Sequence, residues 1–253
     1  MTKQDLYYKW AMSSRNQEGH GRGQNLTRKM LDTLGQAIVT GRYDARPFPT
    51  EAEIGKAHGV SRSVTREAVK MLTAKGLVSA RPRHGTVIEP TSEWNLLDPD
   101  VLRWMLERKF SVELLRHFNQ LRIAIEPEAA ALAARHHTRD DLRHIRDGLS
   151  RMSAAEAGSD DPLEADIDFH VAVLRGSRNP FYLQFRSMVS TALRTSIRFT
   201  NQLKGGIASV ADHAAVAEAI ERRDPDAAHA AMAAIIHEVL TLIEESNASA
   251  AKR

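Results

Sequence analysis

Residues 48–88 constrain the fold of this chain more than any other stretch. They hold two short helical patterns, a tight turn between them and two strand-like runs. Thr50 and Glu53 have the spacing of a capping box, which opens a first helix. Gly59 ends that helix, because glycine readily adopts the left-handed conformation at a helix C-terminus.

A second helical pattern follows at once. Ser61 is a favourable N-cap for it. The positions that face inward are apolar: Val64, Ala68 and Met71 or Leu72. Arg62 and Arg66 are four residues apart, so they share a face that points away from those side chains. Two helices joined by a short turn, the second basic outside and apolar inside, predict a helix-turn-helix.

The two strand-like runs, 76–78 and 85–88, complete this module. Between them lies a turn that carries Arg81, Arg83 and His84. A strand pair with a basic tip beside a helix-turn-helix indicates a winged DNA-binding module.

Several separated motifs in this module resemble the GntR family of bacterial regulators. They are Phe-Pro-Thr-Glu from residue 48, Gly-Val-Ser-Arg-Ser-Val-Thr-Arg-Glu-Ala-Val from 59, Gly-Leu-Val from 76 and His-Gly-Thr-Val from 84. The resemblance implies that six residues meet DNA: Ser61, Arg62, Val64 and Arg66 from the second helix, and His84 and Gly85 from the wing. The family often has an arginine where this chain has Ala52, which leaves one expected DNA contact open. Without the resemblance, Arg62 and Arg66 would be an ordinary solvated helix face.

The distribution of charge supports a nucleic-acid partner for the N-terminal third alone. The 253 residues carry a net charge of +3, but residues 1–90 carry +7 and the remainder −4. The length suits two domains. The chain has no cysteine, which excludes disulfides and cysteine-based metal sites. We see no apolar run of membrane-spanning length and no signal-peptide core, so we expect a cytoplasmic protein without a membrane partner.

The expected fold is mainly α, with the winged helix-turn-helix followed by an all-α bundle of six or seven helices. We expect a mobile tail over 1–24, a DNA-binding domain over 25–90 that begins with a helix near 26–39, a linker and docking helix over 91–110, and a helical domain over 111–247. Within that last domain we place helices near 111–136, 138–157, 162–176, 180–203, 209–223 and 225–247.

Polar residues interrupt the apolar stripes of this bundle. Asp166 and His170 are four apart on the inward stripe of one helix, and His213 lies on the inward stripe of another. Buried ionisable groups are costly unless they are paired or bind metal. A carboxylate and two imidazoles from two helices suit zinc or a similar divalent ion. A hydrogen-bonded Asp–His pair is the alternative.

The motifs around these residues resemble the FCD domain, the C-terminal partner in the fatty-acid-regulator-like branch of GntR proteins. The resemblance rests on Asp-Ile-Asp-Phe-His from 166, Asn179-Pro180, Asp212-His213 and Asp-Pro-Asp-Ala-Ala from 224. In many such domains an Asp and three His hold a metal. The position of the third histidine is Ile235 here, and His237 lies about 200° further round an ideal helix, so it does not replace it.

The same resemblance places Arg122 and Arg194 in an effector cavity. A salt bridge from Arg122 to Glu126, four residues on, is the alternative for a surface helix. A guanidinium beside an open metal site suits a small carboxylate. The segment from Trp94 to Trp104 resembles family members that respond to a sugar acid.

Three functions remain in competition. The first is an effector-controlled transcription regulator, dimeric on a near-palindromic double-stranded operator, which we take to be a repressor and not an enzyme. The second is a metal-dependent hydrolytic enzyme fused to a DNA-binding module. The third is an architectural DNA binder without an effector. The first explains the basic N-terminal third, which an enzymatic function does not need. An enzyme would also need a general acid or base near the metal beyond its ligands, and no helix offers an obvious one.

Overall fold

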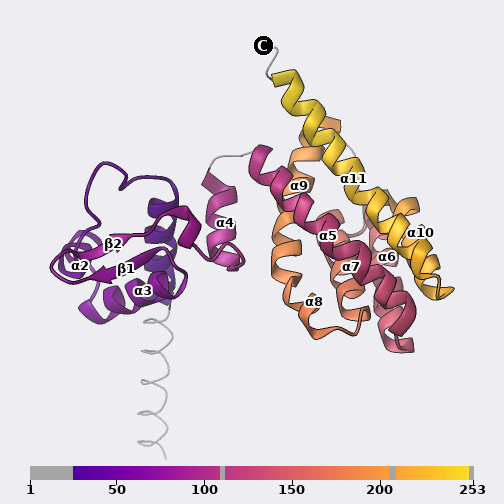
Figure 1. The fold of residues 1–253 in the computed structure, drawn as a ribbon, viewed down its shortest axis with the longest axis horizontal. Coiled ribbons are helices and arrows are strands. Elements are labelled where there is room, and N and C mark those ends of the chain that lie inside the picture. Colours follow the sequence, from indigo (N-terminus) through magenta and orange to yellow (C-terminus); the bar gives the residue numbers. More distant parts are fainter. Residues whose placement is uncertain (1–24, 109–111, 205–208, 251–253) are drawn as a thin grey trace, which may run out of the picture. The chain divides into compact units, whose positions relative to one another are not determined.

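The computed structural model describes residues 25–108, 112–204 and 209–250. The chain divides into two units, Met1–Lys109 and Phe110–Arg253, each with its own core (Figure 1). The tail expected over 1–24 lies outside the described residues.

The first unit is a winged helix-turn-helix, as predicted. A helix over 25–39 precedes α2 (Glu51–His58) and α3 (Arg62–Ala74), and the antiparallel strands β1 (Val78–Arg81) and β2 (Gly85–Ile88) form the wing. The strand register pairs Val78 with Ile88 and Arg81 with Gly85. This register leaves a three-residue turn at the tip.

Local caps define the ends of the two helices. The Thr50 hydroxyl accepts the Glu53 N–H at 3.3 Å, and the Glu53 carboxylate accepts the Thr50 N–H at 2.8 Å. Gly59 ends α2 at φ 64°, where a side chain would be strained. Ser61 caps α3 through the N–H of Val64 at 3.4 Å. These contacts confirm the capping box, the C-terminal glycine and the second N-cap.

The buried stripe of α3 is turned slightly from the one expected. Its buried residues are Thr65, Ala68, Val69 and Leu72, while Val64 and Met71 are half-buried at the edge of the same core. Arg62 and Arg66 stay on the opposite, exposed face.

Helix α4 (Pro99–Arg108), which lies in the segment expected to be a linker and docking helix, is part of the first unit. Trp104 is fully buried in the core of the DNA-binding module. A Cβ placed on Gly35 would lie 2.3 Å from the Trp104 ring, so only glycine allows this contact. The sequence pattern predicts that four residues of this helix face inward: Val101, Leu102, Met105 and Leu106. Val101 and Leu102 are buried as predicted, whereas Met105 and Leu106 are half-buried and Trp104 is buried as well.

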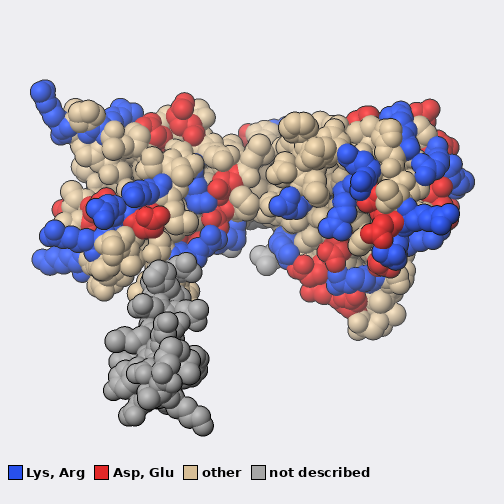
Figure 2. Space-filling model, turned by 90° about the horizontal axis from the view of Figure 1, so that it is seen from below, with Lys and Arg blue, Asp and Glu red and all other residues tan. Residues whose placement is uncertain are grey.

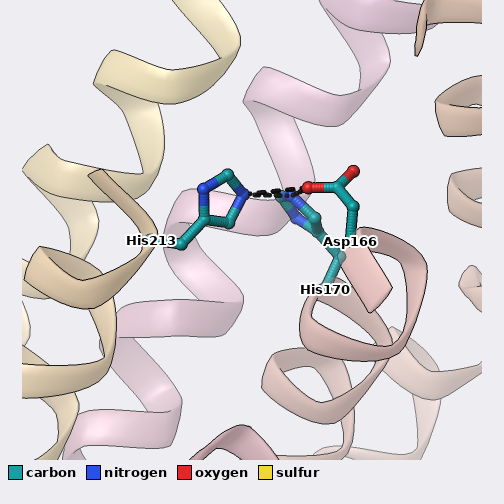
Figure 3. A group of neighbouring side chains, drawn as sticks. All are labelled: Asp166, His170 and His213. Carbon is teal, nitrogen blue, oxygen red and sulfur yellow. Dashed lines mark hydrogen bonds and ion pairs between the residues drawn. The ribbon is translucent and has the colours of Figure 1, made fainter. Parts of the chain in front are cut away.

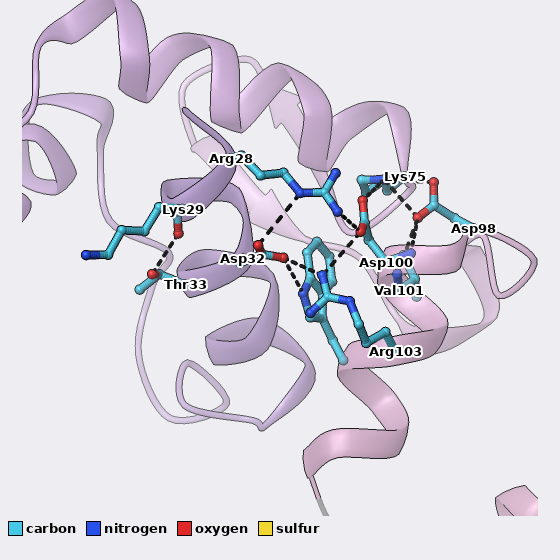
Figure 4. A network of polar contacts seen from close by, with 10 residues as sticks. Arg28, Lys29, Asp32, Thr33, Lys75, Asp98, Asp100, Val101 and Arg103 are labelled. Atoms are coloured by element: carbon cyan, nitrogen blue, oxygen red, sulfur yellow. Dashed lines mark hydrogen bonds and ion pairs between the residues drawn. The ribbon is translucent and has the colours of Figure 1, made fainter. Parts of the chain in front are cut away.

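A network of ion pairs holds α4 against the rest of the unit (Figure 4). Lys75, at the C-terminus of α3, lies 2.8 Å from Asp98 and 2.9 Å from Asp100. Asp98 also caps α4 by accepting the N–H groups of residues 100 and 101. Asp32, on the first helix, accepts the indole N–H of Trp104 at 3.0 Å. The preceding 3-10 helix (Thr91–Glu93) joins the wing to this network.

The second unit is all-helical among its described residues. Its helices are α5 (Val112–His136), α6 (Arg139–Glu156), α7 (Pro162–Gly176), α8 (Pro180–Gln184), α9 (Arg186–Lys204), α10 (Val210–Glu221) and α11 (Pro225–Ala250). The single helix expected over 180–203 is therefore two. Helix α11 packs along α5, and α7 packs against α5, α6 and α9 (Figure 1). Helices α6 and α7 approach closely at Gly148 of α6. A Cβ added there would lie only 2.8 Å from the Cα of Phe169, so the close approach requires glycine.

One segment, Pro225–Glu245 in α11, is long and apolar enough to span a membrane by length and composition, with a mean hydropathy of 1.3. Our sequence analysis found no such run. The segment contributes Ala228, Met232 and Ile236 to the core of the bundle, and the helices of soluble bundles pass the same test.

Candidate functional site

The exposed face of α3 carries the arginines predicted to meet DNA. Ser61, Arg62 and Arg66 are exposed, and Val64 is half-buried. Neither arginine forms an ion pair with any of the described residues, so both guanidinium groups are available to an anion. Figure 2 shows basic and acidic side chains on this face of both units, with several Lys and Arg side chains projecting from the first.

The wing tip adds a second group of exposed residues. His84 is exposed, with Nδ1 3.0 Å from the carbonyl oxygen of Pro82. Arg83 and Gly85 both have positive φ, 66° and 73°. Arg81 differs from the others, because it pairs with Glu89 at 3.3 Å and is partly neutralised.

A second polar cluster lies inside the helical unit. Asp166 and His170 come from α7 and His213 from α10, and all three side chains are buried (Figure 3). One ligand atom from each residue lies within 4.8 Å of the other two. The three predicted metal ligands therefore meet at one point.

The hydrogen bonds of the two imidazoles leave their Nε2 atoms facing this point. His213 Nδ1 lies 2.7 Å from the carbonyl oxygen of Ser209, one helical turn back. His170 Nδ1 lies 2.5 Å from Glu126 Oε2. Each Nδ1 faces an acceptor and so carries the proton of the neutral ring, which leaves a lone pair on each Nε2. The two Nε2 atoms are 3.3 Å apart.

The carboxylate of Asp166 completes the group. Its Oδ1 lies 3.1 Å from His213 Nε2 and 3.8 Å from His170 Nε2. Among the described residues, no donor hydrogen-bonds this buried oxygen. Burial acts to raise the pKa of Asp166, but His213, His170 and the charge of Arg122 hold it below its usual value. A carboxylate oxygen and two imidazole nitrogens that converge in this way form a donor set that fits a cation.

Glu126 is a buried member of this cluster that the sequence analysis did not assign to it. Its carboxylate contacts His170 and also accepts the Nε–H of Arg122 at 2.5 Å. Both Arg122 and Glu126 are 1% exposed. Burial acts to raise the pKa of Glu126, but Arg122 and His170 lower it to about 2. The i,i+4 spacing indicated the Arg122–Glu126 pair, and nothing in the sequence indicated its contact with α7.

The remaining predicted site residues form no hydrogen bond or ion pair with this cluster among the described residues. Arg194, on α9, is half-exposed and pairs with Glu164, with one N–O distance of 2.9 Å. Ile235 is half-buried against the apolar core, and His237 is exposed. Neither supplies a fourth protein ligand, as the sequence analysis expected for both positions.

Two family models match this chain. Residues 26–88 match the bacterial regulatory proteins of the gntR family, and residues 118–238 match the FCD domain. Both matched stretches coincide with folded parts of the two units. The fold is also similar to that of Lar, a solved structure with 18% identity that covers 87% of this chain and 96% of its own, with a TM-score of 0.51.

Two Escherichia coli proteins are similar over nearly their whole length. The uncharacterized HTH-type transcriptional regulator YieP is 35% identical over 84% of this chain and 93% of its own. The galactonate operon transcriptional repressor is 35% identical over 84% of this chain and 94% of its own. With its winged helix-turn-helix and its helical effector domain, the chain belongs to the GntR family of DNA-binding transcription regulators, in the branch that carries an FCD domain.

Proposed function

We propose that this regulator represses a catabolic operon and that a sugar acid, bound at a zinc-containing site in its FCD domain, controls its affinity for the operator. The observation that carries the proposal is the convergence of Asp166 Oδ1, His170 Nε2 and His213 Nε2 beside a buried arginine, in a chain that also has a basic recognition helix.

The donor set favours zinc. Two imidazole nitrogens and one carboxylate oxygen are ligands that zinc accepts at a tetrahedral site. With Ile235 in place of a further histidine, only three protein ligands are present. Zinc sites with three protein ligands keep a position for water or for an oxygen of a bound molecule. When bound, the ion would supply a positive charge and an attachment point for such an oxygen.

The buried charges favour an anionic effector. Arg122 is positive, Glu126 and Asp166 are negative, and an imidazole is neutral when it binds a metal, so the protein groups of the metal-bound site carry one net negative charge. A divalent ion changes this to one net positive charge. A monocarboxylate then neutralises the buried site, which lowers the cost of keeping it out of water.

Arg122 has the donors to bind such a carboxylate. It forms three hydrogen bonds, two with Glu126 and one with Asn119 at 3.2 Å. A guanidinium has five N–H donors, so two are left for a carboxylate. The 35% identity with the galactonate operon repressor supports a sugar acid, because its hydroxyl could occupy the open position on the ion while its carboxylate contacts arginine. Arg194 would add a second contact from α9.

The DNA-binding side of the proposal requires two copies of the chain. One module presents Ser61, Arg62, Val64 and Arg66 from α3, and His84 and Gly85 from the wing. Helix-turn-helix dimers contact two half-sites of a near-palindromic operator, and we assign the dimer contact to the helical domain. A regulator of this kind acts on cytoplasmic DNA.

A ligand screen tests the proposal. Thermal stability of the zinc-loaded protein is measured against a panel of sugar acids, before and after chelation, and operator affinity is measured with each stabilising acid. We expect one acid to raise the melting temperature and to change operator affinity only while the metal is present. If no acid stabilises the protein, or if the same response persists after complete removal of the metal, the proposal fails. The first outcome would favour an architectural DNA binder.

A further inference from the structure

Glu126 lies between the two parts of the proposed effector site. Its Oε1 accepts the Nε–H of Arg122 at 2.5 Å, and its Oε2 lies 2.5 Å from His170 Nδ1. All three side chains are 1% exposed, so water does not compete for these contacts. One carboxylate therefore contacts both the proposed effector arginine on α5 and a proposed metal ligand on α7.

We infer that Glu126 is a positioning residue, which holds His170 in the tautomer that can bind a metal and fixes Arg122 beside it. This inference rests on the proposed metal site. An ionised carboxylate only accepts hydrogen bonds, so the nitrogen that faces it must carry the proton. With the proton on Nδ1, the lone pair on Nε2 is free for the ion. Carboxylates that orient metal-binding histidines in this way typically change metal affinity about 10–100-fold when they are replaced.

Glu126→Gln tests the inference because it preserves the shape and reverses one hydrogen bond. The glutamine oxygen should occupy the position that faces Arg122 Nε, since a donor there would oppose a buried cation. The amide NH₂ then faces His170 Nδ1 and donates to it. This arrangement selects the other tautomer, with the proton on Nε2, where the ion would bind.

Two measurements follow the change. The first is the ¹⁵N NMR spectrum of His170 in the metal-free protein at about pH 8.5, where an ordinary imidazole is neutral. We expect Nδ1–H in the parent protein and Nε2–H in Glu126→Gln. The second is zinc affinity by competition with a chelator, which we expect to fall about 10–100-fold.

Glu128→Gln is the matched control. It makes the same substitution two residues along α5, at a carboxylate that is 46% exposed and pairs only weakly, at 3.8 Å, with Arg135. We expect neither the His170 tautomer nor the zinc affinity to change in this variant. A loss of zinc affinity in both variants would overturn the inference, because removing one negative charge at either position of α5 would then have the same effect.

The double variant Arg122→Met/Glu126→Gln provides a rescue. Without the cation, the amide is free to turn its oxygen toward His170, so Nδ1–H and most of the zinc affinity should return. If Glu126→Gln is too unstable to measure, this double variant still tests the inference, since it removes both members of the buried Arg122–Glu126 ion pair together. A double variant with the Nε2–H tautomer would contradict the role of Glu126.

The two readouts separate this inference from the proposed function. If the parent protein binds no zinc, the proposed metal site fails, but the tautomer of His170 still shows whether Glu126 orients the ring. If the parent binds zinc and Glu126→Gln keeps both the parent tautomer and the parent affinity, the metal site stands and the inference is wrong.

Discussion

The two units of this regulator place their functional charges in opposite environments. On α3 of the first unit, Arg62 and Arg66 are exposed and pair with none of the described residues. In the second unit, Arg122 is 1% exposed and pairs with Glu126. DNA is a large polyanion that can be met only from outside, whereas a small ligand can be enclosed. If the proposed sites are correct, the comparison indicates that a charge for a large partner is left solvated, whereas a charge for a small partner is buried with a counter-charge.

The two environments also differ in what a substitution should do. When an exposed arginine is removed, water takes its place, so the change affects binding of the partner and not the stability of the fold. Removal of one member of a buried pair leaves the other without compensation, which typically costs about 3–5 kcal/mol. Substitution of a functional charge should therefore change binding without changing stability in the first unit, whereas in the second unit it should change both.

The largest expected effect comes from Trp104→Ala, which tests whether α4 belongs to the first unit. Trp104 is fully buried and donates to Asp32. Its removal should destabilise the first unit by about 3–5 kcal/mol and weaken operator binding through partial unfolding. Zinc binding by the second unit should persist. Thermal unfolding and zinc titration of the same sample give both readouts.

Leu97→Ala is the control for that prediction. Leu97 lies in the same segment but is 54% exposed, so its truncation should change stability by less than about 0.5 kcal/mol. A comparable loss in both variants would show that the segment is sensitive to any change, and would remove the special role of Trp104.

The next largest effect should follow His213→Ala, which removes one of the three proposed ligands in the second unit. Replacing a group that only orients a metal ligand typically lowers metal affinity about 10–100-fold. His213 is itself a proposed ligand, so zinc affinity should fall further in this variant, and the effector response should disappear with the metal. Basal operator affinity should remain, because the first unit has its own core. Elemental analysis and operator titrations check both. Full zinc content in the variant would make His213 a packed core histidine.

Arg66→Ala should have an intermediate effect, confined to DNA. Operator binding should weaken by about 1–3 kcal/mol at fixed salt if the guanidinium contacts a base edge, with the loss concentrated at one position of the site. The melting temperature should not change, since Arg66 is exposed. Lys29→Ala removes an equal charge from the exposed surface of the first helix. An equal loss in both variants would indicate general charge attraction instead of a specific contact.

The smallest expected effect overall follows Arg194→Ala, which should change stability little. Its pair with Glu164 is more than 40% exposed on both sides, and exposed pairs contribute about 0–1 kcal/mol. If Arg194 contacts the effector, the variant should need more effector to release the operator, while Glu164→Gln should not. An effector titration that is identical for Arg194→Ala and the parent protein would remove Arg194 from the site.

Much of the first unit could be predicted because its signals are local. Thr50 and Glu53 close a capping box within one helical turn, and Gly59 and Ser61 define the turn between the helices. Such contacts depend on neighbours in the sequence, so the sequence shows both partners at once. The helices of the second unit were predictable for the same reason, because several of them begin at a proline or end at a glycine.

The i,i+4 spacing of Asp166 and His170 indicated a shared face, and the apolar stripe around His213 indicated that its side chain points inward. The resemblance to the FCD domain then supported a shared metal site. The sequence by itself thus determined the elements, the basic recognition helix and the residues of the proposed metal site. It could not show that Trp104 packs against Gly35 in the core of the first unit. Nor could it show that the Glu126 carboxylate contacts His170, which is 44 residues away in the chain. Those contacts join residues that are distant in the chain. Only the packing of whole helices decides which side chains meet there, and no local pattern encodes it.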